Sequence, residues 1–297
     1  MRALILSDGR MGHLNQCIAL AKYAGYEYRI CNISYKRRYL KSLSYLLDRL
    51  RWYTEALFSY ENLSDERFDY IIAAGSTTAY PLKVLARKYN AKSVAMMLPK
   101  GYRYDYGVIF AQSHDNPPQQ DNICVLPANF SFSEPQGLYS AEKKSIGIVI
   151  GGDNKVFSFS LDELGRQLKH IFESFNGYEF AVTTSPRTSV EIEDLLEHYD
   201  FDYRVIYSKN PVNPIPDFLH QCDRVFITQD STSMISEAVS SGKACIEVLP
   251  LASNSDNKFT RLTQELQKEG YLHIYDGTFA DADRKIDFTE FIHKVGL

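Results

Sequence analysis

The sequence predicts an α/β protein made of two doubly wound, Rossmann-like domains. Short apolar runs of strand length alternate with amphipathic stretches of helix length along most of the chain. This rhythm is typical of a parallel sheet covered by helices on both faces. It breaks in a proline-containing stretch at residues 116–144 and then restarts. The length of 297 residues also favours two domains of about 150 residues each.

The expected elements follow in order along the chain. In a first domain, residues 1–130, we expect strands at 3–7, 27–32, 70–74, 93–97 and 107–111 and helices at 14–24 and 78–89. Residues 131–144 form the expected linker. In a second domain, residues 145–297, we expect strands at 145–150, 179–183, 203–207, 224–228 and 244–249 and helices at 161–175, 189–198, 215–221, 231–241 and 257–269. The last stretch, residues 276–297, carries no readable motif.

Composition narrows the class of protein. Hydrophobic residues make up 44% and charged residues 24%, which excludes a disordered, collagen-like or coiled-coil chain. A net charge of −4 argues against general electrostatic binding to nucleic acid. Five cysteines without CxxC spacing predict neither a disulfide framework nor a zinc site, and they fit a reduced, cytoplasmic setting. No apolar run reaches the length of a membrane span, and the short N-terminal run indicates a strand rather than a signal peptide.

Function in such folds is expected in the loops at the carboxyl ends of the strands, where two facing domains would form an interdomain cleft. The loop after the first strand holds His13, a candidate general base. The alternative is that His13 caps or packs the helix start. The residues of this loop that we assign to the acceptor side or the cleft are Asp8, Gly9, Gly12, Asn15 and Gln16.

Two loops of the second domain are candidates for binding phosphate. Gly151 and Gly152 follow a strand, so their N–H groups would suit a diphosphate beside a helix start, with Lys155 adding charge. The alternative is a plain tight turn. The loop after the next strand contributes Thr184, Ser185 and Arg187, whose guanidinium suits phosphate. Helix capping with a solvated arginine is the alternative there.

The most informative loop follows the expected strand at 224–228. Hydroxyl residues begin a helix, where N–H groups and the helix dipole favour a phosphate, and Glu237 lies further along where it would accept both hydroxyls of a ribose. The alternative is a simple helix cap with a surface glutamate. The donor-binding candidates of this loop are Asp230, Ser231, Thr232, Ser233 and Glu237.

Two further stretches have open interpretations. His114 and Asp115 follow the expected strand at 107–111 and either face the cleft, with Asp115 as a second candidate base, or form a surface turn. Lys36–Tyr53 combines six cations with one acid and interleaved apolar residues. That pattern indicates either an amphipathic helix on an anionic membrane surface or a core-facing helix with a solvated basic face.

Taken together, these loops resemble the plant mitochondrial-fission adaptor family and its bacterial relatives, which are regarded as GT-B glycosyltransferases. The matching segments are 8–16, 114–115, 151–155, 183–188 and 228–243, in order along most of the chain. Pro186-Arg187 stands where the family usually has paired arginines. The second half also resembles the donor domain of the membrane-associated transferase that makes lipid II, in which a glutamate placed like Glu237 holds the ribose.

The resemblance implies a GT-B fold and transfer of a sugar from a nucleotide-activated donor without a bound metal or permanent cofactor. The implied acceptor is a lipopolysaccharide or lipid-linked glycan of the cell envelope, which fits a cytoplasmic protein at the inner face of the membrane. Some relatives are adaptors, so a non-catalytic, membrane-associated adaptor is the alternative. A nucleotide-sugar epimerase ranks third, because the only acids suited to its catalysis are Asp8, Asp115 and Asp230.

Overall fold

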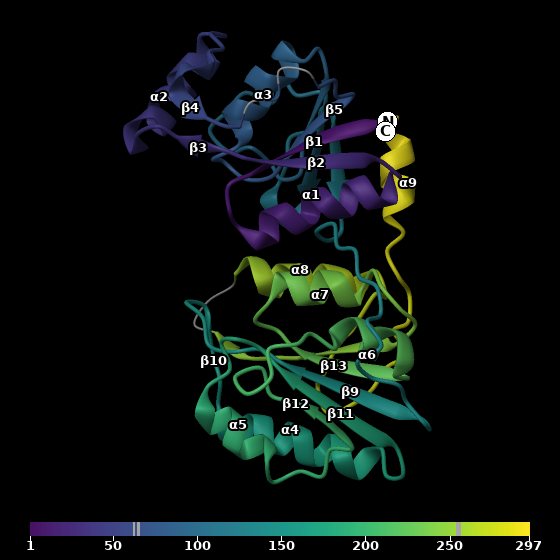
Figure 1. Ribbon diagram of the computed structural model, residues 1–297. Helices are drawn as coiled ribbons and strands as arrows, with labels where there is room; N and C mark the ends of the chain where they lie inside the picture. Colours follow the sequence, from purple (N-terminus) through teal and green to yellow (C-terminus); the bar gives the residue numbers. More distant parts are fainter. Residues whose placement is uncertain (62, 64–65, 254–256) are drawn as a thin grey trace. The chain divides into compact units, whose positions relative to one another are not determined.

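The structure is a computed structural model that describes residues 1–61, 63, 66–253 and 257–297 (Figure 1). Its internal contacts divide the chain into two units. The first unit holds residues 1–132 together with 287–297, and the second holds residues 133–286. In its described residues, each unit contains one six-stranded parallel sheet, as the alternation of apolar runs predicts.

The first sheet contains two neighbouring strands, β1 and β5, whose carboxyl ends lead into the loops described below. Its order is β2 (Glu27–Asn32), β1 (Arg2–Ser7), β5 (Tyr70–Ala73), β6 (Lys92–Ala95), β7 (Val108–Gln112) and β8 (Ile123–Leu126). β8 lies inside the stretch expected to be irregular and extends the sheet at its edge. The order steps outward in both directions from β1, as in a doubly wound fold.

Helices cover both faces of this sheet. α1 (Met11–Tyr23) lies on one face and α3 (Ala79–Lys88) on the other, with α2 (Arg38–Arg49) beside α3 (Figure 1). Every residue of β1 from Ala3 to Leu6 is buried, because alternate side chains enter the two covered faces. Short elements complete the unit: η1 (Glu55–Leu57), η2 (Ser113–Asp115), and the pair β3 (Ser34–Tyr35) and β4 (Phe58–Ser59).

The second sheet places three candidate donor loops side by side. Its order is β12 (Tyr203–Val205), β11 (Glu179–Thr184), β9 (Ser145–Ile150), β13 (Arg224–Thr228), β14 (Cys245–Leu249) and β16 (His273–Ile274). α4 (Leu161–Ser174) and α5 (Val190–Leu196) cover one face, and α6 (Ile215–Gln221), α7 (Thr232–Ala238) and α8 (Lys258–Lys268) the other (Figure 1). β10 (Phe157–Ser158) pairs with β15 (Ala252–Ser253). Neighbours β11, β9 and β13 therefore end at one edge.

The C-terminal helix corrects the expected domain boundary, which kept residues 145–297 together. α9 (Phe288–Lys294) belongs to the first unit and packs against α1. Phe288 is fully buried there, stacked on Phe130 with ring centroids 4.4 Å apart and edge-on to Tyr23 at 5.7 Å. Burial of the Phe288 ring, rather than the position of α9 in the sequence, determines the unit to which this helix belongs.

Candidate functional site

The loop after β1 holds a hydrogen-bonded pair of acid and base. Asp8 has a side chain only 3% exposed, and its carboxylate lies 3.1 and 3.2 Å from Nδ1 of His13. α1 begins at Met11, three residues earlier than expected, so His13 lies in its first turn. The Asp8 contact fixes the orientation of the imidazole and leaves Nε2 as the ring nitrogen for other chemistry. The sequence indicated both residues but not their pairing.

Gly75, in the loop after β5, packs against the imidazole of His13. Its φ of +85° is in the left-handed region, and a Cβ added there would overlap the His13 ring atoms. The next residues hold a cation, because Nζ of Lys41 donates to Ser76 Oγ at 2.9 Å and to Thr77 Oγ1 at 3.5 Å. Sequence reasoning missed this loop; its small and hydroxyl residues directly after a strand were the available signal.

The remaining residues of the first loop divide into exposed and structural ones. Gly12 and Asn15 are exposed at the start of α1. Gln16 is buried, and its amide donates to Gly12 O at 3.2 Å. Gly9 donates its N–H to the hydroxyl of Ser7 and so shapes the turn.

Asp115 is not brought to His13. It ends η2 after β7, and β5 and β6 separate β7 from β1, a span of about 14 Å at about 4.8 Å per strand. Its carboxylate instead pairs with Nζ of Lys100 at 2.7 Å. The side chain of His114 lies outside the described residues. The structure therefore gives Asp8, and not Asp115, as the carboxylate beside the candidate base.

Asp230 joins the three strand-end loops of the second unit. Its side chain is fully buried and accepts from Thr228 Oγ1 at 2.7 Å, Gly152 N at 3.2 Å and an Arg187 guanidinium nitrogen at 2.6 Å. Asn154 donates to the Asp230 backbone carbonyl at 3.1 Å. The expected donor residue Asp230 is thus the centre of a hydrogen-bond network that fixes the loops after β9, β11 and β13.

The glycine pair differs from its expected role. Gly151 N donates to Thr228 Oγ1 at 2.8 Å, and Gly152 N donates to Asp230. Both N–H groups are therefore occupied inside the protein, and α4 begins only at Leu161, so no helix starts beside them. A Cβ on Gly151 would overlap the Asp230 carboxylate, and one on Gly152 would overlap the backbone of Arg187. Close packing between loops explains why both positions are glycine.

The loop after β11 mixes structural and exposed groups. Thr184 is buried and accepts the N–H of Tyr207 at 2.9 Å, and Ser185 bonds Thr188. Thr188, which sequence reasoning did not single out, donates to Gly151 O at 2.6 Å. Arg187 keeps 42% of its side chain exposed while it pairs with Asp230, so part of its guanidinium still faces solvent. Lys155 is exposed.

The loop after β13 and helix α7 place the candidate ribose-binding group. Ser231 caps α7 by accepting the N–H of Met234 at 3.4 Å, Thr232 is partly exposed and Ser233 is exposed. Glu237 accepts a hydrogen bond from Ser133 Oγ at 2.6 Å, a partner that the sequence did not indicate. Desolvation raises the pKa of the Glu237 carboxyl, although the Ser133 hydrogen bond opposes the rise.

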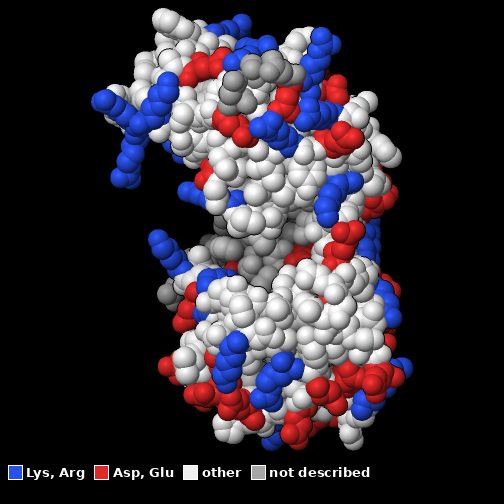
Figure 2. Space-filling model, in the orientation of Figure 1, with Lys and Arg blue, Asp and Glu red and all other residues white. Residues whose placement is uncertain are grey.

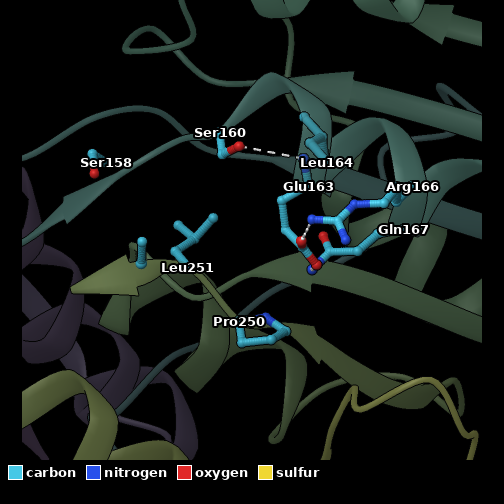
Figure 3. Close-up of a pocket in the computed structure, with 9 residues that line it drawn as sticks. Ser158, Ser160, Glu163, Leu164, Arg166, Gln167, Pro250 and Leu251 are labelled. Atoms are coloured by element: carbon cyan, nitrogen blue, oxygen red, sulfur yellow. Dashed lines mark hydrogen bonds and ion pairs between the residues drawn. The ribbon is translucent and has the colours of Figure 1, made fainter.

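A pocket of about 410 Å³ lies in the second unit between the start of α4 and the loop after β14 (Figure 3). Leu164, Pro250 and Leu251 supply apolar walls, and Glu163 pairs with Arg166 at its rim. None of the expected donor residues lines it. Among the residues that the structure describes, no cluster of three or more His, Cys, Asp or Glu side chains could hold a metal ion.

Comparison with known proteins gives two kinds of result. An uncharacterized protein, RP120 of Rickettsia prowazekii, is 25% identical over 86% of this chain and 85% of its own length. Among solved structures, Arabidopsis thaliana UGT89C1 complexed with UDP-L-rhamnose matches 98% of this chain and 87% of its own, with a TM-score of 0.52 at 11% identity. MurG of Acinetobacter baumannii matches 95% of this chain and 87% of its own, with a TM-score of 0.48 at 13% identity.

The family match covers nearly the whole chain. The model of the family described as "Mitochondrial fission ELM1" matches residues 11–291, which include both sheets apart from β1 and the strand-end loops apart from residues 8–10. The likeness to UGT89C1 bears on the fold alone, and it confirms the expected GT-B architecture. This chain therefore belongs to the mitochondrial fission ELM1 family and has the GT-B fold of glycosyltransferases.

Proposed function

We propose that the protein is a metal-independent glycosyltransferase that moves a sugar from a nucleotide-activated donor to a lipopolysaccharide or lipid-linked glycan. The observation that carries the proposal is the buried Asp8 carboxylate bonded to Nδ1 of His13 at the carboxyl end of β1. A partly exposed histidine oriented by a buried acid is an arrangement suited to general base catalysis. The GT-B fold supplies the context for sugar transfer.

The proposed reaction needs one proton acceptor and one stabilised leaving group. Nε2 of His13 takes the proton of an acceptor hydroxyl while that oxygen bonds the anomeric carbon of the donor sugar. The bond from this carbon to the diphosphate oxygen breaks, and the nucleoside diphosphate leaves with the bonding electrons. Asp8 stabilises the imidazolium that forms. These steps assume an inverting reaction, which stays a prediction.

The donor is proposed to bind at the carboxyl edge of the second sheet. Glu237 would accept the ribose hydroxyls, as acidic residues do in other nucleotide sites. The solvent-facing part of Arg187 and the exposed Lys155 and Ser233 would contact the diphosphate. Gly151 and Gly152 would leave space for the donor rather than hydrogen-bond to it, because their N–H groups already donate to Thr228 and Asp230.

A nucleotide-binding measurement tests this assignment. A thermal-shift panel of nucleoside diphosphates and nucleotide sugars first identifies the donor class, since a ligand at a hundredfold excess over its dissociation constant adds about 2.7 kcal/mol of stability. In Glu237→Ala the affinity for that nucleotide should fall about 10- to 100-fold, because a charged hydrogen bond is lost. Unchanged affinity in a folded Glu237→Ala protein would contradict the assignment of the donor site.

The raised pKa of Glu237 adds a pH test with a defined sign. The carboxylate is the form that accepts ribose hydrogen bonds, so affinity should fall as the pH is lowered from neutral towards this raised pKa. The glutamine side chain of Glu237→Gln is uncharged at every pH, so this variant should lack the part of the pH dependence that comes from Glu237. The phosphate groups of the nucleotide titrate in the same way with both proteins. Parallel pH profiles for the two proteins would contradict the assignment.

A non-catalytic adaptor is the second candidate, and one observation favours it. The polar groups expected to hold the diphosphate are largely paired inside the protein: Gly151 and Gly152 through their N–H groups, and Arg187 through Asp230. An adaptor predicts no nucleotide binding by any member of the panel. The epimerase has no such support, because Asp8, Asp115 and Asp230 are each engaged with a basic side chain.

A further inference from the structure

We propose that the α2 surface, defined as the exposed side chains of residues 36–39, 42–43, 46 and 49–52, is a docking site for an anionic lipid membrane. One side of α2 is fixed to the protein core. Leu40, Leu47 and Tyr45 pack against the first hydrophobic core, and Asp48 is fully buried. Asp48 Oδ1 lies 2.7 Å from Nζ of the fully buried Lys83. This buried ion pair sets the rotation of α2 about its own axis, because turning the helix would strip Lys83 of a partner.

The opposite side of α2 exposes a row of large apolar side chains. Tyr39, Leu43, Leu46 and Leu50 follow one another at intervals of four, three and four residues, which places them on one stripe of a helix. Each is at least 36% exposed, and Trp52 in the following turn is 65% exposed. Single exposed apolar residues are ordinary, but a continuous stripe of this kind marks an interaction surface.

Cations flank this stripe and decide the kind of partner. Lys36, Arg37, Arg38, Arg49 and Arg51 are all exposed, and none of them forms an ion pair with a carboxylate within the described ranges 1–61, 63, 66–253 and 257–297. The acid of this segment, Asp48, is buried. Figure 2 shows Lys and Arg side chains projecting where Figure 1 draws α2. Apolar side chains flanked by unpaired cations match an anionic lipid surface.

The sixth cation of the segment, Lys41, points elsewhere. Its Nζ is bound by Ser76 and Thr77, so it belongs to the loop after β5 rather than to the α2 surface. The expectation from the sequence, which counted Lys41 with the basic face, is corrected here. None of the helices among the described residues is long and apolar enough to cross a bilayer.

The C-terminal end of α2 gives an independent indication that a cation is favoured on this surface. Trp52 N donates to Leu47 O and Arg51 N to Asp48 O, which is the Schellman pattern that usually has glycine at the left-handed position. Arg51 occupies that position with φ of +57°. A non-glycine residue is strained in this conformation. A cation is thus present at a position where the backbone alone favours glycine.

Trp52 is the single tryptophan of the chain and makes the test direct. Its fluorescence should shift to shorter wavelength when the protein is mixed with phosphatidylcholine vesicles that contain phosphatidylglycerol, and the protein should co-sediment with them. Both effects should weaken with added salt and be absent with vesicles of phosphatidylcholine alone. Shifts of equal size with both vesicles would overturn the electrostatic assignment, and no shift with either would overturn the proposal.

Arg51→Gly is the sharpest variant, because it removes a cation while it relieves backbone strain. It should be at least as stable as the parent protein and yet bind vesicles about fivefold more weakly, the factor corresponding to about 1 kcal/mol per cation near an anionic surface. Arg37→Glu with Arg38→Glu should weaken binding further. Lys169→Gln and Lys268→Gln remove exposed cations elsewhere and are the matched controls.

Another occupant of the α2 surface would give a different pattern. If a second copy of the chain covers it, Trp52 fluorescence should shift with protein concentration in the absence of vesicles, together with a doubling of the mass in solution. That outcome would overturn the membrane proposal. Equal vesicle binding by Arg51→Gly and the controls would also overturn it. Neither result bears on nucleotide binding, so the proposed transferase is tested separately.

Discussion

Two buried carboxylates, Asp8 and Asp230, organise the strand-end loops of the two units in different ways. Asp8 holds the imidazole of His13, whose other ring nitrogen makes no part of that contact. Asp230 is surrounded by donors from Thr228, Gly152 and Arg187. The first arrangement leaves a group available for chemistry, and the second uses its groups for structure. At the scale of single residues, the reactive candidate is therefore in the first unit.

His13→Ala should lower the rate of sugar transfer about 10²- to 10⁴-fold, the usual contribution of a general base. Donor affinity should stay unchanged, because His13 is in the other unit from the proposed donor residues. Asp8→Asn should also lower turnover, since the amide no longer stabilises an imidazolium. Steady-state transfer assays with the donor from the thermal-shift panel measure both effects. Glu27→Gln, at an exposed position of the same unit, is the control. Full activity in His13→Ala would eliminate His13 as the base.

At the scale of elements, packing between loops determines which residues the ends of β9, β11 and β13 can hold. Gly152 lies against the backbone of Arg187, and the hydroxyl of Thr188 donates a hydrogen bond to the carbonyl oxygen of Gly151. The loops are therefore held by contacts to one another as much as by their own turns. The sequence indicated a glycine pair suited to phosphate, but the neighbouring loop that occupies this space could not be known before the strand order.

Gly152→Ala should destabilise the protein by about 1–3 kcal/mol, because the added methyl group overlaps backbone atoms that cannot move aside easily. Gly165→Ala is the matched control in α4, where the nearest atoms to an added Cβ are 3.8 and 3.9 Å away. Alanine there should be neutral or stabilising by up to about 1 kcal/mol, because it favours the helix. Urea unfolding measures both changes, and equal stability of the two variants would contradict the packing argument.

At the scale of the whole molecule, the chain returns to its first unit at the end. α9 completes a cluster of aromatic rings with Tyr23, Phe130 and Phe132, although more than 150 residues separate α9 from these partners. The stability of the first unit therefore depends on the last residues of the chain. Nothing in the local sequence of 276–297 indicated this partner.

Phe288→Ala should destabilise the first unit by about 3–5 kcal/mol, because it removes a fully buried ring from the cluster. Hydrogen exchange should quicken in β1, β5 and α1 and stay unchanged in β9 and β11. Leu161→Ala, at an exposed position of α4, is the control and should change stability by less than about 0.5 kcal/mol. Faster exchange in the second unit instead would show that α9 belongs there.

The sequence by itself determined the alternation of strands and helices, the two sheets and the loops in which chemistry should be sought. These follow from local periodicity, which each segment carries independently of its partners. It also indicated His13, Asp8 and Glu237 as functional candidates, because each lies in a loop after a strand or in the helix that follows that loop. The GT-B fold was predicted from the resemblance of several loops together, and it is confirmed.

Only the tertiary structure decided which residues meet. The pairing of Asp8 with His13 over Gly75, the network around Asp230, the Ser133 contact of Glu237 and the return of α9 all join residues that different elements bring together. The same is true of Asp115, which the strand order keeps away from His13. Such contacts depend on strand order and on the packing of side chains across the sheet, and no local pattern specifies either.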